Sequence, residues 1–195
     1  PSAAAREGAS TCTVSPLPAD WLCHTNCSDG LFRGANDWSQ GMSNFDREEV
    51  ISILNQIMEL ELAGVVRYTH YSLMVYGYNR LPIVDWMKKN AAEGLAHAAR
   101  AGEMATLLGG HPSLAIGPLL ETHRHDISDI LKESLDHENM AKAAYYRLLA
   151  LVAGKNVLLE EYARELIVDE ELHADEVNKM LRRPGDTAAF EGSRD

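Results

Sequence analysis

Glutamate and histidine residues occur in this sequence at spacings that suit metal binding. The segment Glu170-Glu171-Leu172-His173 places a carboxylate and an imidazole three residues apart, at Glu170 and His173. Residues three apart on an α-helix lie on the same face. Together they suit a divalent transition metal, because they combine a hard ligand with a borderline one. The spacing alone is common by chance, so the pair needs support from the rest of the chain.

Three other segments with helical spacing carry the same residue types. Glu61 stands in the middle of an apolar stripe, and Glu93 and His97 are four residues apart and share a helix face. His137 and Glu138 both fall at helical spacing within a further stripe, so one or both face the buried side. Each of four helices therefore carries an acid or a histidine near its middle.

Each of these residues has a simpler explanation when it is taken alone. A glutamate at the edge of a stripe can reach water or pair with an arginine, and a buried histidine can be hydrogen-bonded. Those explanations do not suffice when carboxylates from several helices are buried at the same height of one bundle, since each unpaired charge would cost several kcal/mol. Two cations bridged by carboxylates would compensate that cost, as they do in di-metal four-helix bundles.

Four long amphipathic helices are predicted to position these groups, and no strand alternation interrupts them. Caps, prolines and glycines place them from Asp46 to near Gly77, from Pro82 to Gly109, from near Pro118 to Gly154, and from Asn156 to Pro184. The sequence has no Gly-rich phosphate loop and no Gly-x-Ser-x-Gly elbow, which argues against nucleotide-binding proteins and α/β-hydrolases. The predicted fold class is all-α, a four-helix bundle.

The chain is expected to divide near residue 45. Residues 1–45 lack a helical or strand period and are predicted to be an irregular N-terminal extension. Residues 46–182 would form the bundle and residues 183–195 a frayed C-terminal tail. The extension holds Cys12, Cys23, Cys27 and His24, which form either a small zinc site or, in the simpler interpretation, a disulfide, free thiols or a surface contact.

Charge and hydropathy restrict the partners. The 195 residues include 18 basic and 29 acidic side chains, for a net charge of −11. This balance argues against nucleic acid and anionic membrane surfaces and is compatible with cations. No apolar stretch is long enough to cross a bilayer, and the first residues do not resemble a secretory signal, so we expect a cytoplasmic location.

Four segments resemble the bacterioferritin branch of the ferritin-like superfamily. They are Leu54-Asn55-Gln56-Ile57-Met58-Glu59-Leu60-Glu61-Leu62-Ala63, His97-Ala98-Ala99-Arg100, Leu107-Leu108-Gly109-Gly110-His111-Pro112 and Asp169-Glu170-Glu171-Leu172-His173. The resemblance covers residues 47–182 and implies a ferritin-like antiparallel four-helix bundle with a long crossover. Bundles with this stripe pattern often pair antiparallel, so we expect a homo-oligomer, at least a dimer, and the resemblance adds a larger shell as a further possibility.

The sequence departs from the family pattern at three positions. The second-helix glutamate of the family would stand at Gly94, whereas the acid here is Glu93, one residue earlier. The third-helix glutamate aligns with His137, with Glu138 beside it. Leu95 stands where the family has its haem-ligating methionine, so no haem is expected.

The resemblance implies a di-iron centre, with manganese or zinc as other metals, that oxidises Fe(II) with O2 or peroxide for iron storage or detoxification. One ion would be bound by Glu61 and His97, and the other by His173 with His137 or Glu138. The remaining acids, Glu93 and Glu170, would bridge the ions.

Tyr68 matches a tyrosine of the family that would hydrogen-bond a ligand or donate an electron, although a packed tyrosine with a satisfied hydroxyl is the simpler interpretation. Two other functions stay open. One is a structural or assembly protein with a degenerate metal site, and the other is a di-metal oxidase acting on another substrate.

Overall fold

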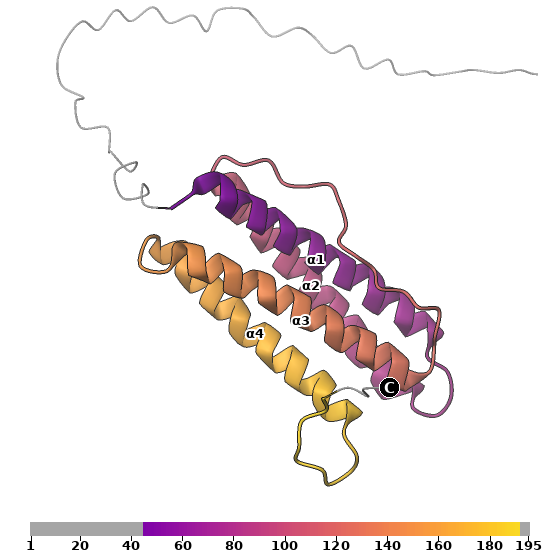
Figure 1. The fold of residues 1–195 in the computed structure, drawn as a ribbon. Helices are drawn as coiled ribbons and strands as arrows, with labels where there is room; N and C mark the ends of the chain where they lie inside the picture. Colours follow the sequence, from indigo (N-terminus) through magenta and orange to yellow (C-terminus); the bar gives the residue numbers. More distant parts are fainter. Residues whose placement is uncertain (1–44, 192–195) are drawn as a thin grey trace, which may run out of the picture. The chain divides into compact units, whose positions relative to one another are not determined.

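The computed structural model describes residues 45–191, and within them it contains four α-helices and no strand. They are α1 (Arg47–Met74), α2 (Arg80–Leu107), α3 (Ile127–Val152) and α4 (Val157–Leu181), and they lie side by side as a bundle (Figure 1). The predicted all-α class is therefore confirmed. In this part of the chain no helix is long and apolar enough to cross a membrane.

Short polar side chains begin three of the helices. Asp46 accepts a hydrogen bond from the backbone N–H of Glu49, and Asp126 caps α3 in the same way. Asn156 caps α4, directly after the turn at Gly154, whose φ of +69° favours glycine. These caps satisfy backbone donors that a helix start leaves unpaired.

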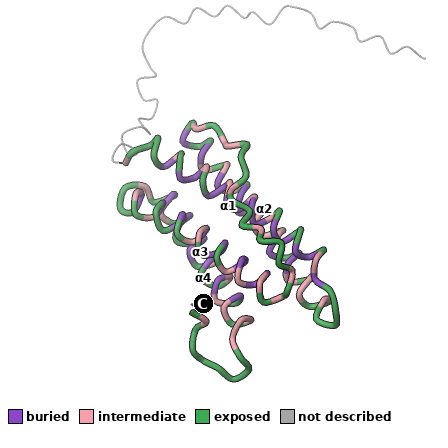
Figure 2. The backbone as a smooth tube through the Cα atoms, turned by 45° about the vertical axis from the view of Figure 1, so that its right-hand side comes forward, coloured by how far each residue is buried: buried purple, intermediate pink, exposed green. Residues whose placement is uncertain are grey.

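The helices pack as two hairpins, α1 with α2 and α3 with α4, and α1 also contacts α3. Buried residues follow the sides of the helices that face one another (Figure 2). The larger apolar cluster contains Leu54, Ile57, Tyr145, Leu148 and Leu166, all fully or almost fully buried. Polar side chains interrupt this core near its middle, as the sequence predicts.

A long crossover, residues 108–126, joins α2 to α3 and runs along α1 (Figure 1). Its backbone is bonded to α1 through the N–H of Gly117, which donates to the carbonyl of Glu59 at 2.9 Å. The expected start of the third helix near Pro118 is wrong, because the chain stays extended there and α3 begins only at Ile127. The crossover must reach the opposite end of α1 before α3 can begin. The residues from Pro118 to Asp126, which were expected in the third helix, therefore belong to the crossover.

The C-terminal tail also differs from expectation. Residues 186–190 do not fray as expected, because Phe190 is bonded to Asn178 on α4. The side chain of Asn178 donates to the carbonyl of Phe190 at 2.9 Å and accepts from the N–H of Phe190 at 3.1 Å. Such a two-bond contact is a local side-chain interaction that helical periodicity does not reveal. The division of the chain at residues 45 and 182 stays a prediction.

Candidate metal centre

Two groups of potential ligands lie in the middle of the bundle and share one residue. Glu61, His97 and Glu170 form the first group, and Glu138, Glu170 and His173 form the second. Within each group the ligand atoms lie within 4.8 Å of one another. All four helices contribute, α1 with Glu61, α2 with His97, α3 with Glu138, and α4 with the shared Glu170.

The first group is fully buried. Nδ1 of His97 lies 3.2 Å from Oε1 of Glu170 and 3.7 Å from Oε2 of Glu61. The hydroxyl of Tyr145 donates a hydrogen bond of 2.8 Å to Oε1 of Glu61 and leaves the other oxygen facing the histidine. This bond fixes the orientation of the carboxylate, as outer partners of metal ligands commonly do.

The second group lies closer to solvent on one side. Nδ1 of His173 lies 3.9 Å from Oε2 of Glu170, and the His173 side chain is 20 % exposed. Glu138 is buried, and the hydroxyl of Tyr68 donates to its Oε1. Tyr68 is buried and this bond satisfies its hydroxyl, which fits both a ligand-orienting tyrosine and a packed one. Its part in any chemistry stays a prediction.

Burial makes this centre unfavourable for negative charge alone. It raises the pKa of the carboxyl groups of Glu61, Glu138 and Glu170. The pKa of Glu138 reaches about 8, because burial and the nearby charge of Glu170 both disfavour ionisation. Burial lowers the pKa of His97, but the close carboxyl groups of Glu170 and Glu61 outweigh it and raise that pKa to about 10. Added cations would compensate the charge of these carboxyl groups when they ionise, so the donor set suits metal ions.

Unpartnered polar atoms support the same fit. Nδ1 of His97 and Oε1 of Glu170 are buried and lie 3.2 Å apart, but neither atom makes a hydrogen bond of good geometry. Buried polar atoms are normally satisfied, so such orphans at the centre of a core call for a missing partner. A metal ion between these two atoms would bind both. The cavity that the ligands line has room for about one water molecule, which is a suitable size for ions.

The structure does not bring Glu93 between the two groups. Its Oε2 lies 3.4 Å from Nε2 of His173, and its Oε1 lies 3.7 Å from Nζ of Lys89. The Glu93 side chain is 37 % exposed, so it stands at the rim of the centre. Gly94 faces the interior instead, since a Cβ atom there would lie 3.6 Å from Oε2 of Glu61.

The structure places His137 and Glu138 in different surroundings. Glu138 belongs to the second ligand group, whereas His137 belongs to neither group within the described residues. Neighbouring residues on a helix point about 100° apart. His137 points to α1, where its Nε2 would lie 2.8 Å from a Cβ atom at Gly64. Burial, together with the charge of Arg67, lowers the pKa of His137 to about 4, so it is neutral, and its Nδ1 has no partner.

Tyr145 contacts the centre through Glu61, although it is not among the predicted site residues. Tyr145 follows Glu138 by seven residues, two helical turns, and therefore lies on the same face. A hydroxyl on an otherwise apolar stripe, in line with a suspected ligand, was the available signal.

Comparison with known families agrees with this geometry. The ferritin-like domain family matches residues 51–184. The chain belongs to the ferritin-like family. No curated protein matches it.

Solved structures share the ferritin-like bundle at low sequence identity. A ferritin-like, diiron-carboxylate protein of Bacillus anthracis has a TM-score of 0.66 and 22% identity, over 70% of this chain and 97% of that one. The dodecameric thioferritin of Bacteroides fragilis, a bacterioferritin-related protein, has a TM-score of 0.68 and 21% identity, over 72% and 89%. The bacterioferritin of Rhodobacter capsulatus has a TM-score of 0.62 and 22% identity, over 69% and 84%.

These likenesses confirm the predicted bacterioferritin-like fold of this ferritin-like protein. They do not extend to its ligands, because the identities are too low to transfer residue roles. Leu95, which stands at the position of the family's haem-ligating methionine, is 55% exposed on α2.

Proposed function

We propose that this ferritin-like protein binds two metal ions in its bundle and oxidises Fe(II) with O2 or peroxide, for iron storage or detoxification. One observation carries the proposal. Glu170 contacts His97 on one side and His173 on the other, and it has a buried oxygen without a partner. A carboxylate in that position is suited to bridge two cations.

The proposal assigns five ligands from four helices. Glu61 and His97 would bind one ion, Glu138 and His173 the other, and Glu170 both. Glu93 stays a predicted additional ligand of the second ion, since it contacts His173 from the rim. Tyr145 and Tyr68 would orient Glu61 and Glu138 through their hydroxyl groups.

Fe(II) is the substrate in this reaction. Two Fe(II) ions give up one electron each, and with two protons these reduce O2 to H2O2, or H2O2 to two waters. The carboxylates favour the product, because hard oxygen ligands stabilise the higher charge of Fe(III). Burial keeps bulk water away from the ligands and strengthens each charge interaction.

The test is aerobic addition of Fe(II) to the metal-free protein, followed by ultraviolet absorbance. We expect Glu170→Ala to slow the initial oxidation at least about 100-fold, since loss of even an outer-shell partner typically costs 10–100-fold. The matched control is Glu171→Ala, because Glu171 is the next residue and contacts Lys142 and Tyr146 at the surface. Equal rates for the parent and Glu170→Ala would contradict the proposal.

A second candidate is a ferritin-fold structural or assembly protein with a degenerate site. Gly94 favours it, because the position facing Glu61 carries no carboxylate. His137 favours it too, because a neutral, unpartnered histidine stands beside the ligand groups. Metal analysis separates the two functions, and two bound metal ions per chain that Glu170→Ala loses would exclude this candidate.

We also infer that the chain forms a homo-oligomer, at least a dimer. The bacterioferritin-related protein of Bacteroides fragilis, which shares this fold, is described as dodecameric. Size-exclusion chromatography with light scattering tests the inference, and a monomer at micromolar concentration would contradict it.

A further inference from the structure

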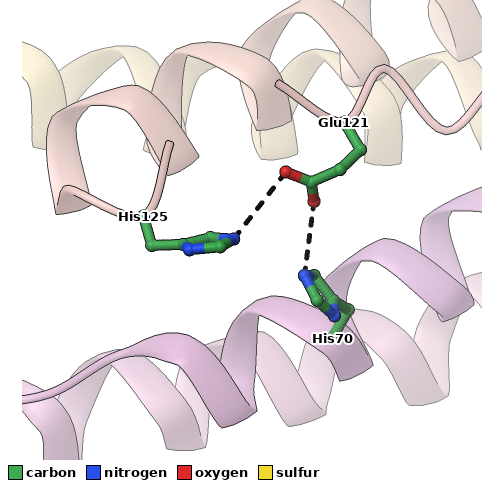
Figure 3. Close-up of side chains that lie close together, drawn as sticks. All are labelled: His70, Glu121 and His125. Carbon is green, nitrogen blue, oxygen red and sulfur yellow. Dashed lines mark ion pairs between the residues drawn. The ribbon is translucent and has the colours of Figure 1, made fainter. Parts of the chain in front are cut away.

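A second cluster of ligand-type residues lies where the crossover meets the end of α1. It consists of His70 on α1 and of Glu121 and His125 on the crossover. Nε2 of His70 lies 3.3 Å from Oε2 of Glu121, and Nε2 of His125 lies 3.7 Å from Oε1 of the same carboxylate. Figure 3 shows the two imidazole rings directed at the two oxygens of this one carboxylate.

These separations fit one small metal ion. Zinc bonds of about 2.0–2.2 Å at tetrahedral angles place neighbouring ligand atoms roughly 3.3–3.6 Å apart. The imidazole nitrogens of His70 and His125 lie 3.3 and 3.7 Å from the two different oxygens of the Glu121 carboxylate. One ligand atom from each of the three residues lies within 4.8 Å of the other two. Small side-chain rotations would therefore complete the geometry.

One potential ligand atom of the cluster makes no hydrogen bond. Nε2 of His125 is buried and has no hydrogen-bond partner. The two rings also pack edge to face, with centroids 5.8 Å apart, so their nitrogens stay close. A buried imidazole nitrogen of this kind, aimed at a carboxylate and a second histidine, is the donor that a divalent metal would take up.

The crossover is anchored on both sides of Glu121. The carbonyl of Leu119 accepts from the guanidinium of Arg67, and the hydroxyl of Thr122 donates to Glu133. The first contact holds the crossover to α1 and the second holds it to α3, on either side of Glu121. The site therefore has a preformed frame, which lowers the entropic cost of binding an ion.

We propose that His70, Glu121 and His125 bind one divalent metal ion of the zinc type, at a site separate from the bundle centre. Two imidazoles and one carboxylate form a three-ligand set that leaves a fourth position open. That position faces solvent, since the side chain of His70 is 46% exposed. The proposal does not depend on iron oxidation at the bundle centre.

The test measures Zn2+ bound per chain by equilibrium dialysis of the full-length, metal-free protein. We expect the double variant His70→Ala/His125→Ala to bind one Zn2+ fewer than the parent. Glu170→Ala should keep this ion while it loses those of the bundle centre, so the two proposals fail independently. The matched control is His111→Ala, an exposed histidine on the same crossover, which should bind as much Zn2+ as the parent.

A conservative variant guards against misfolding. Glu121→Gln keeps the shape of the side chain and should also lose this one Zn2+, with an unchanged helical circular-dichroism spectrum. Co2+ provides a second readout, because a tetrahedral Co2+ site has intense visible bands that both variants should remove. Unchanged Zn2+ stoichiometry in Glu121→Gln and in the double variant, or an equal loss in His111→Ala, would overturn the proposal.

Discussion

The bundle centre and the cluster at the end of α1 use the same residue types in opposite surroundings. The centre takes its ligands from four regular helices and buries them, so its carboxyl groups have raised pKa values. The cluster takes Glu121 and His125 from the crossover and leaves His70 half exposed. Burial makes the centre dependent on a compensating charge, whereas the side chains of the cluster are partly exposed to solvent.

The largest expected effect is the change of the free energy of unfolding with pH in the metal-free protein. The pKa of Glu138 is about 8 in the folded state, against 4.5 for an ordinary glutamate. A raised pKa gives stability that is complete below pH 4.5 and is lost as pH rises to 8, because only the unfolded chain ionises freely. We expect the free energy of unfolding of metal-free protein to fall by several kcal/mol over this window.

Urea unfolding at pH 5 and pH 8 measures this effect. Glu138→Gln should flatten the dependence, since an amide keeps the contact with Tyr68 and does not ionise. A variant at the solvent-facing cluster, Glu121→Gln, should leave the dependence unchanged. If the parent protein is equally stable at both pH values, burial does not raise the pKa of Glu138, and the centre does not differ from the cluster in this respect.

Metal binding should stabilise the two regions by separable amounts. At a free metal concentration 100 times Kd, one site adds about 2.7 kcal/mol to the free energy of unfolding. We expect saturating Zn2+ to raise the Tm of the parent more than that of Glu170→Gln, which keeps only the cluster. His70→Ala/His125→Ala should lose the smaller part of the rise, and chelation with EDTA should reverse all of it. A rise that survives both changes would point to a site elsewhere.

A smaller effect is expected at Tyr145. Tyr145→Phe removes the hydrogen bond to Glu61 and should cost about 1 kcal/mol in stability. It should also weaken metal binding at the centre about tenfold, because the ligand loses its orienting partner. Tyr146→Phe is the control, since that neighbouring hydroxyl contacts Glu171 at the surface. Isothermal titration measures the Zn2+ affinity of both variants. Equal affinities in Tyr145→Phe and Tyr146→Phe would contradict the orienting role of Tyr145.

The smallest effect concerns two glycines beside the centre. A Cβ atom at Gly94 would meet its neighbours at 3.4–3.6 Å, which is ordinary contact, so Gly94→Ala should stabilise α2 by about 0.5–1 kcal/mol. At Gly64 a Cβ atom would lie 2.8 Å from the ring of His137, so Gly64→Ala should destabilise the protein. Thermal unfolding measures the Tm of both variants. A Tm shift of the same sign in both would contradict the close packing of His137 against Gly64.

Much of the bundle could be predicted from periodicity. Glu61, His97, Glu170 and His173 interrupt apolar stripes, and the structure brings all four together at the centre. Periodicity could not separate His137 from Glu138, because both fit the stripe and their surroundings depend on the rotation of α3 against α1. Whether these residues ligate metal stays a prediction.

The remaining features depend on contacts outside helices. The extended path of residues 108–126 depends on hydrogen bonds to α1, such as the bond between Gly117 and Glu59, which no local pattern reveals. The cluster around Glu121 was missed for the same reason, since two of its three residues lie on that path. Cys12, Cys23 and Cys27 lie outside the described residues, and their role stays a prediction.

The crossover also has a consequence for the order of folding. Each hairpin, α1 with α2 and α3 with α4, is closed by a short turn, so its contacts are local in sequence. Contacts between the hairpins must close residues 108–126, which carries a larger entropic cost. Docking of the two hairpins should therefore limit the folding rate, and mutations in the crossover should alter that rate more than mutations in either turn.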